Sequence, residues 1–378
     1  MKILVVSHEY PPIGGGGASA CTFLTEAFAT DGYKITIVTA AFRDIPALEQ
    51  HEGVTIHRVP SKRSHADHCS FFEMLDFIKK AYPLCCKLQE EERFDVCLIF
   101  FGIPSGVIGY RLKKKYQLPY IIRFGGGDIP GFQKRFDKVY KILAPAIKTI
   151  WKHADRRVAN SEGLRDMAYA FCNRYPFDII HNGADTTLFQ PGTETGVSSS
   201  KTFRILFVSR LIERKGLQYF MPQLKWIREK TDRPIHLTVV GDGPLEPELK
   251  KLTTENGLDD IVTFVGRKEK PEIVRYYQDA DLFILPSRVE GMPNVVLEAM
   301  ACGLPIMITP CPGSAELIKE NGYVLEADEF GEKVLEIMAD KELLIRCGRR
   351  SRQIIEEEFE WQTSARQYMG LMEKVVDI

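Results

Sequence analysis

The chain has 378 residues, enough for two domains of ordinary size, and its net charge of −1 gives no general attraction to nucleic acid. Hydrophobic residues make up 44% and charged residues 27%, as in soluble globular proteins. The sequence has no apolar run of the roughly 18 residues that a membrane-spanning helix needs. Its nine cysteines are scattered and include no C-x-x-C pair, which is typical of a reduced, cytoplasmic protein.

Expected strands alternate with helical segments in both halves of the chain. In the first half the strands are KILVVS, ITIVTA, VCLIFFG and YIIRFGG, and in the second RILFVSR, HLTVVGDG, IVTFVG, DLFILPS and PIMITP. Between the halves, Gln190 to Phe203 is rich in Gly, Ser and Thr, lacks periodicity and is predicted to be a linker.

This alternation predicts an α/β protein of two doubly wound, parallel-sheet, Rossmann-like domains with right-handed crossovers. The predicted domains are residues 1–190 and 200–360, and a C-terminal helix at about 361–378 is expected to pack back on the first. We expect the two domains to face each other across a cleft, with a ligand at the carboxyl ends of their strands.

The stretch EGMPNVVLEAMACGLPI begins at Glu290, directly after the apolar run Leu282 to Leu285. A helix is predicted from Asn294 and ends where Gly and Pro follow. Glu298 then lies just over one turn into that helix. The N-terminus of the helix presents backbone N–H groups and a positive dipole end, which suits an anionic ligand such as a diphosphate.

The loop YPPIGGGGAS follows the first predicted strand and opens the first helix, so its glycines allow the backbone to approach a phosphate or sugar. An ordinary flexible loop is the alternative. Gly14 and Gly16 fit a dinucleotide G-x-G, but Ser19 replaces the third glycine. The second strand ends at Ala40 without the acidic residue that a ribose needs, which argues against NAD.

Two cations, Arg210 and Lys215, follow the strand that begins at Arg204. At a strand's carboxyl end they can hold both phosphates of a nucleoside diphosphate. A solvated charge cluster is the alternative, since Glu213 and Arg214 lie between them. The turn VVGDGP at the same edge favours the phosphate interpretation.

The acidic triplet DAD, Asp279 to Asp281, is similar to a metal-binding motif of some transferases. It lies before its strand, at the opposite end from the expected cleft, so no metal site is predicted there. Cys302 is expected to be a small buried residue and not a nucleophile.

Together, YPPIGGGG, VSRLIERKG, VVGDGP, DADLFILPSRVEGMPNVVLEAMACGLPI and HNGAD resemble the retaining glycosyltransferases of family 4, which have the GT-B fold. The resemblance spans most of the chain. It implies transfer of a sugar, most commonly from a UDP-sugar, to a glycan or lipid-linked acceptor in cell-envelope or exopolysaccharide synthesis. It also implies a metal-independent enzyme without a cofactor, whose first domain faces the acceptor and whose second domain binds the donor.

The resemblance implies roles for single residues. Glu298 would hydrogen-bond the ribose hydroxyls, and Glu290 would face the transferred sugar. Arg210 and Lys215 would neutralise the leaving diphosphate, so Arg210, Lys215 and Glu290 form the implied catalytic set. The implied donor-binding residues are Gly15, Gly16, Arg210, Lys215, Gly241, Glu290, Gly291, Met292, Asn294, Val295 and Glu298.

One motif departs from the family. Many members carry a histidine in an H-G-x-D arrangement after the strand that corresponds to PYIIRF, and Gly125 takes that place here. No catalytic histidine is therefore assigned. Asp128 is retained, and Asp128 and Asn182 are candidate sugar- or acceptor-facing groups, with a loop cap as the alternative for Asp128. A nucleotide-sugar epimerase or a non-catalytic binding protein of the same fold is the alternative function.

A basic stripe is predicted on the helical segment between Gln133 and Arg157. Its members share one face at helical spacing and are Lys134, Lys138, Lys141, Lys148 and Lys152. A solvated face of an ordinary helix is one interpretation, and peripheral contact with an anionic inner-membrane surface is the other.

Overall fold

The computed structural model describes residues 1–66, 69–132, 136–192 and 201–377. The chain forms two compact units: unit 1 is Met1–Asn182 with Trp361–Ile378, and unit 2 is Gly183–Glu360. The predicted linker between Gln190 and Phe203 falls largely on residues 193–200, outside the described residues.

Unit 1 contains an eight-stranded sheet in the order β3-β4-β2-β1-β5-β6-β7-β8. Its strands pair in parallel except at one edge, where β3 runs antiparallel to β4, a departure from the all-parallel expectation. The strands are β1 (Lys2–Val6), β2 (Lys34–Ala40), β3 (Leu48–His51), β4 (Val54–Val59), β5 (Val96–Phe100), β6 (Tyr120–Arg123), β7 (Arg156–Ala159) and β8 (Asp178–Ile179).

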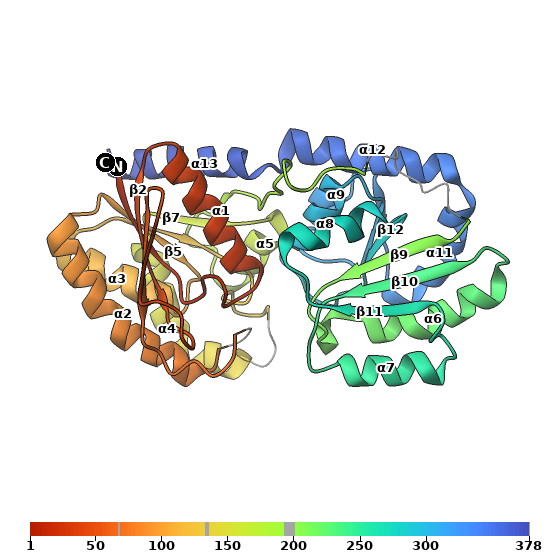
Figure 1. The fold of residues 1–378 in the computed structure, drawn as a ribbon. Coiled ribbons are helices and arrows are strands. Elements are labelled where there is room, and N and C mark those ends of the chain that lie inside the picture. Colours follow the sequence, from red (N-terminus) through yellow and green to blue (C-terminus); the bar gives the residue numbers. More distant parts are fainter. Residues whose placement is uncertain (67–68, 133–135, 193–200, 378) are drawn as a thin grey trace. The chain divides into compact units, whose positions relative to one another are not determined.

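Helices cover both faces of the unit 1 sheet, with α1 and α13 on one face and α2, α3 and α4 on the other (Figure 1). The C-terminal helix α13 packs along α1, and the Trp361 ring stacks on the Phe23 ring with 5.2 Å between centroids. The helices are α1 (Gly16–Thr30), α2 (Phe71–Glu92), α3 (Ser105–Tyr116), α4 (Asp137–His153), α5 (Glu162–Phe171) and α13 (Trp361–Val376).

Unit 2 contains a six-stranded sheet in the order β11-β10-β9-β12-β13-β14, in which the strands pair in parallel. The first strand along the chain, β9, lies in the middle beside β12, so the connections run outward in both directions, as in a doubly wound fold. The strands are β9 (Phe203–Val208), β10 (Ile235–Val240), β11 (Val262–Gly266), β12 (Leu282–Leu285), β13 (Ile306–Ile308) and β14 (Gly322–Val324).

Both faces of the unit 2 sheet are covered, with α6, α7 and α11 on one face and α8, α9 and α12 on the other (Figure 1). The apolar run predicted as a buried strand is confirmed: it is β12, and its side chains are at most 1% exposed. The helical elements are η2 (Glu213–Lys215), α6 (Leu217–Lys230), α7 (Glu246–Glu255), α8 (Lys270–Gln278), α9 (Asn294–Ala301), α10 (Ser314–Leu317), η3 (Ala327–Glu329), α11 (Phe330–Ala339) and α12 (Lys341–Glu358).

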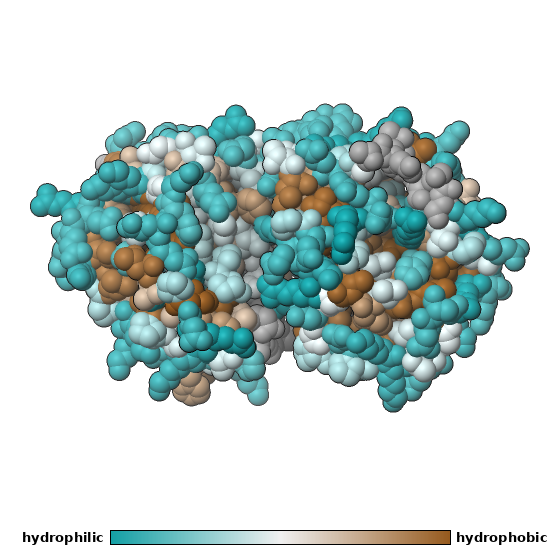
Figure 2. Space-filling model, in the orientation of Figure 1, coloured by the Kyte–Doolittle hydropathy of each residue, from teal (hydrophilic) through white to brown (hydrophobic). Residues whose placement is uncertain are grey.

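On the face drawn in Figure 2, hydrophilic residues predominate and smaller hydrophobic patches lie between them. Within the described ranges, no helix is both long enough and apolar enough to span a membrane.

Of the predicted lysine stripe, Lys138, Lys141, Lys148 and Lys152 are exposed on α4, whereas Lys134 lies outside the described residues. The opposite side of α4 is buried through residues such as Ile147 and Trp151.

Candidate functional site

The candidate site of unit 2 lies where the strand order reverses, at the carboxyl ends of the adjacent strands β9 and β12. Connections leave these strands in opposite directions, which opens a crevice at this edge of a doubly wound sheet. The segment after β9 contains Arg210 and Lys215, and the segment after β12 contains Glu290. The sheet thus gathers residues that are far apart in the sequence.

Lys215 and Glu290 form a hydrogen-bonded ion pair through Nζ and Oε1. Both residues are buried, at 8% and 9% exposure. The Ser287 hydroxyl donates to the same carboxylate oxygen over 2.7 Å. The carboxylate expected to face the sugar and the ammonium expected to face the phosphates therefore hold each other, a contact that the sequence did not indicate.

The pKa values of this pair reflect burial and charge acting together. Burial lowers the pKa of the Lys215 ammonium below its usual range, against the opposing effect of Glu290. For Glu290, burial alone would raise the pKa, but the charges of Lys215 and Arg214 outweigh it and the pKa lies below its usual range. Glu290 is therefore ionised at neutral pH.

Two glycines allow the close backbone approach that builds this edge. Gly216 has φ of +76°, and a Cβ there would lie 1.8 Å from the Pro286 carbonyl oxygen. This contact brings η2, and with it Lys215, against the end of β12. Gly241, of the predicted donor-binding set, has φ of +135°, and its Cβ would lie 1.9 Å from the Ser209 carbonyl oxygen. No side chain fits at either position without moving backbone.

Arg210 adds a second cation to the same edge. It is partly buried, and its charge contributes to lowering the pKa of Lys215, so the two cations lie within electrostatic reach of each other. Arg214, on η2 between them, acts on both Lys215 and Glu290. Among the buried and partly buried charged residues of these two segments, the three cations Arg210, Arg214 and Lys215 therefore outnumber the one carboxylate of Glu290, which favours an anionic ligand.

The turn from Glu290 into α9 places backbone groups at the same edge. Gly291 and Met292 are buried, and α9 begins at Asn294 with Pro293 as its N-cap residue. In the described part of the chain no side chain caps this N-terminus. Its amides and the positive end of the helix dipole are positioned for an anionic group.

Glu298 lies in α9 and is partly buried. The hydroxyl of Tyr277, from α8, donates to its Oε2 over 2.9 Å. Burial raises the pKa of Glu298 to about 7, although Lys270 and the Tyr277 hydrogen bond act in the opposite direction. The two glutamates of the motif therefore have pKa values that are shifted in opposite directions.

Val295, also predicted, is partly buried in the first turn of α9, and the other four predicted residues lie in unit 1. Gly15 is the N-cap residue of α1 and Gly16 its first residue, and a Cβ on Gly15 would meet no atom within 4 Å. Asn182 accepts a hydrogen bond from Arg123 over 2.5 Å, in the buried interior. Gly15 thus has open space beside it, whereas Asn182 is enclosed.

Asp128 connects two loops of unit 1. Its carboxylate accepts hydrogen bonds from the backbone N–H groups of Gly102 over 2.7 Å and Gly125 over 2.9 Å. These bonds give Asp128 the geometry of a loop cap. Gly125, which stands where the family has histidine, packs against Phe101, because a Cβ there would lie 2.9 Å from the Phe101 ring.

The triplet DAD lies at the other end of the unit 2 sheet. The carboxylate of Asp281 is 2% exposed and accepts the backbone N–H of Arg204 over 2.8 Å, at the start of β9. Asp279 is the C-cap residue of α8. Both aspartates thus have structural contacts at the amino ends of the strands, away from Lys215 and Glu290.

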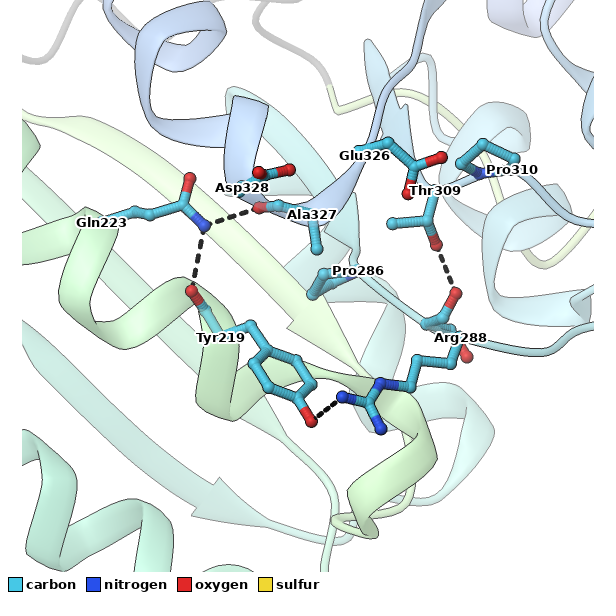
Figure 3. A pocket seen from close by; sticks show the side chains of 10 residues that line it. Tyr219, Gln223, Pro286, Arg288, Thr309, Pro310, Glu326, Ala327 and Asp328 are labelled. Carbon is cyan, nitrogen blue, oxygen red and sulfur yellow. Dashed lines mark hydrogen bonds between the residues drawn. The ribbon is translucent and has the colours of Figure 1, made fainter.

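A cavity of about 510 Å³ lies beside α6 and the ends of β12 and β13 (Figure 3). The Arg288 guanidinium lies over the Tyr219 ring and donates to its hydroxyl, and Gln223 bonds backbone carbonyls at the rim. Ser287 lines this cavity and also contacts Glu290. In the described part of the chain, the predicted donor-binding residues do not line it.

Comparison with known proteins identifies the class. The model of Glycosyltransferase Family 4 matches residues 14–188, and that of Glycosyl transferases group 1 matches residues 202–340. An uncharacterized glycosyltransferase of Methanocaldococcus jannaschii is 24% identical over 96% of this chain and 95% of its own. A GDP-mannose-dependent alpha-(1-6)-phosphatidylinositol monomannoside mannosyltransferase of Mycobacterium tuberculosis is 30% identical over 52% of this chain and 56% of its own. The amylovoran biosynthesis glycosyltransferase AmsK of Erwinia amylovora is 26% identical over 74% of this chain and 70% of its own.

Solved structures share the fold. Sucrose-phosphate synthase from Thermosynechococcus elongatus superposes with a TM-score of 0.86 at 20% identity, over 99% of this chain and 98% of that one. HepE of Anabaena, solved in complex with UDP-glucose, gives a TM-score of 0.77 at 19% identity, over 99% of this chain and all (100%) of that one. The chain is therefore a glycosyltransferase with the GT-B fold.

Proposed function

We propose that the chain is a retaining, metal-independent glycosyltransferase of family 4 that takes its sugar from a nucleoside diphosphate sugar. Its acceptor is a glycan or a lipid-linked saccharide of the cell envelope or of an exopolysaccharide. The observation that carries the donor assignment is the convergence of Arg210, Lys215, Glu290 and the α9 N-terminus on one sheet edge. The amylovoran and phosphatidylinositol mannoside enzymes among the relatives support the acceptor class.

The chemistry follows from charge. As the bond between the anomeric carbon and the diphosphate oxygen breaks, the sugar becomes positively charged and the diphosphate gains negative charge. Arg210, Lys215 and the α9 amides stabilise the departing diphosphate. The contact with Glu290 fixes the Lys215 ammonium before substrate arrives, so little reorganisation is needed during the reaction.

The two glutamates divide the donor between them. Glu290, which stays ionised, faces the sugar as positive charge develops there, and backbone groups from Met292 to Val295 hold phosphate and sugar. Glu298 accepts the ribose hydroxyls. We propose uridine as the base, in line with the UDP-glucose complex of HepE, and the GDP-mannose-dependent relative makes guanosine the first competitor.

Binding measurements with UDP, GDP, ADP and their sugars test this function. One of these ligands should raise the melting temperature of the full chain by mass action. Glu298→Ala should weaken the nucleoside diphosphate and the nucleotide sugar alike, by about 1–3 kcal/mol, since a hydrogen bond to a charged group is lost. Glu290→Gln in folded protein should reduce turnover far more than it changes the affinity for the diphosphate, because the effect on affinity is limited to the altered setting of Lys215. If none of the ligands stabilises the protein, the donor assignment is wrong.

The comparisons do not favour the epimerase or binding-only alternatives. Incubation of the nucleotide sugar with and without an acceptor extract separates them from a transferase. A transferase forms a glycosylated product only with the acceptor. An epimerase changes the nucleotide sugar without it, and a binding protein changes nothing.

A further inference from the structure

The carboxylate of Glu298 is held by one buried aromatic residue. Tyr277 is 0% exposed, and its hydroxyl donates to Glu298 Oε2 over 2.9 Å. Its ring packs edge-on against Phe189, with 5.8 Å between centroids, and at 6.0 Å from the ring of Phe283. These contacts fix the ring, so the hydroxyl has a defined position and can orient the carboxylate that it bonds.

The surroundings of Glu298 contain few groups that stabilise a negative charge. In the described part of the chain, the Tyr277 hydroxyl is the hydrogen-bond donor to this carboxylate. Lys270, at the start of α8, attracts the Glu298 carboxylate electrostatically. Cys302, the C-cap residue of α9, is a second titratable group near this carboxylate. Arg352 of α12 acts electrostatically on Cys302, and its guanidinium donates to the Ala301 carbonyl over 2.8 Å. A partly buried carboxylate with so little compensation is costly to ionise.

We propose that Tyr277 is a positioning residue for Glu298, and that this pair makes donor binding depend on the charge of Glu298. The carboxylate held by Tyr277 offers one charged oxygen to each ribose hydroxyl, whereas in the protonated acid one of the two oxygens carries a proton and becomes a donor, so the two-oxygen acceptor is lost. The inference rests on the proposed function, because it assigns a nucleoside ribose to Glu298.

The sign of the pH dependence follows from the ionisation of Glu298. Burial raises its pKa to about 7, so the acid form predominates at pH 6 and the carboxylate at pH 8. The ligand binds the carboxylate form, and its apparent affinity scales with the fraction of protein in that form. Ribose-dependent affinity is therefore expected to fall by about tenfold from pH 8 to pH 6.

Isothermal titration of the full chain with UDP, GDP and ADP between pH 6 and pH 9 measures this dependence. The terminal phosphate of a nucleoside diphosphate also titrates near pH 6 to 7, so the 2′,3′-dideoxy analogue of the tightest ligand serves as the control. It keeps the phosphate titration but lacks the diol. The ribonucleotide should show an additional loss of affinity at low pH that the dideoxy analogue does not show.

Tyr277→Phe distinguishes positioning from a structural role. The lost hydrogen bond favours the charged form in the wild-type protein. The variant should therefore move the midpoint of the ribose-dependent pH profile upward, with affinity recovering toward wild type at pH 9. A purely structural defect would lower affinity equally at every pH. Tyr276→Phe, at the adjacent position of α8 where the ring contacts Arg275, is the matched control and should leave the midpoint unchanged.

A second variant keeps the test valid even where Tyr277→Phe does not fold. Lys270→Gln removes a charge that lowers the pKa of Glu298, so it should also move the midpoint upward. Identical pH profiles for the ribonucleotide and its dideoxy analogue, or unmoved midpoints in folded Tyr277→Phe and Lys270→Gln, would overturn the inference and leave the proposed function standing. Absence of binding by all three nucleotides across the pH range would instead refute the proposed function, and the inference with it.

Discussion

Replacing Glu290 by Gln is expected to destabilise unit 2, because it leaves a buried ammonium without its counter-charge. Lys215 and Glu290 are 8% and 9% exposed and in direct contact. Removing one partner of such a pair typically costs about 3–5 kcal/mol, and the Gln carbonyl retains one hydrogen bond, so we expect the lower end of that range. A domain stability is about 5–15 kcal/mol, so the loss is large.

Urea denaturation followed by hydrogen exchange measures this loss in each unit separately, which a single global transition would not. For a slope of about 2–3 kcal/mol per molar urea, the midpoint of unit 2 should fall by about 1–1.5 M, and that of unit 1 should not change. Glu213→Gln removes an exposed carboxylate from the same η2 segment and should change stability by less than about 0.5 kcal/mol. Lys215→Met combined with Glu290→Gln should recover part of the loss.

The loss of stability in Glu290→Gln is predicted to depend on pH. The pKa of Glu290 in the folded chain lies below its usual 4.5, so its contribution is fully present above pH 4.5 and is lost as the pH falls through the folded value. The difference between wild type and Glu290→Gln should therefore narrow in acid. Equal stability of Glu290→Gln and Glu213→Gln at pH 7 would show that the ion pair does not stabilise the end of β12, and the reasoning would be refuted.

Two further predictions concern metal and membrane. Transfer should be unchanged in excess chelator, because Arg210 and Lys215 supply the positive charge that a metal would otherwise provide; activity lost in chelator and restored by manganese or magnesium would contradict this. Full-length protein should co-sediment with anionic but not neutral liposomes, more weakly at high salt, since each basic residue near lipid contributes about 1 kcal/mol. Changing Lys138, Lys141 and Lys148 to Glu should weaken this binding, and equal sedimentation with both vesicle types, or sedimentation with neither, would refute the membrane contact.

The central strands of the fold could be predicted from sequence because they are continuous apolar runs. Leu282 to Leu285 is buried on both faces of the sheet and forms β12. The end of the next helix, α9, could also be predicted, because Gly303 follows it. The edge strand β3 was not predicted, because Leu48–His51 is mostly polar and exposed. Its antiparallel pairing with β4 across a turn that includes Gly53 follows from local geometry and not from burial.

The residues that gather at the carboxyl ends of β9 and β12 were also predicted as a set, but their partners were not. Lys215 and Glu290 are 75 positions apart, and Tyr277 and Glu298 are 21 apart, so neither contact follows from spacing along a helix or strand. Ser287 is only three positions before Glu290, but nothing in the sequence predicted the hydrogen bond between their side chains. The fold determines these pairings by placing β9 beside β12 and α8 beside α9.

The opposite pKa shifts of the two glutamates separate their roles. Glu290 lies among Lys215, Arg214 and Ser287, so its charge is stabilised and it remains a carboxylate throughout the physiological range. Glu298 has the neutral Tyr277 hydroxyl as its bonded partner, so burial dominates and its charge depends on pH near 7. A permanently charged group suits a reacting sugar that becomes positive, whereas a titrating group suits a binding contact with neutral hydroxyls. Under the proposed function, the turn before α9 supplies a constant charge for the reaction, and α9 itself supplies a pH-dependent charge for donor affinity.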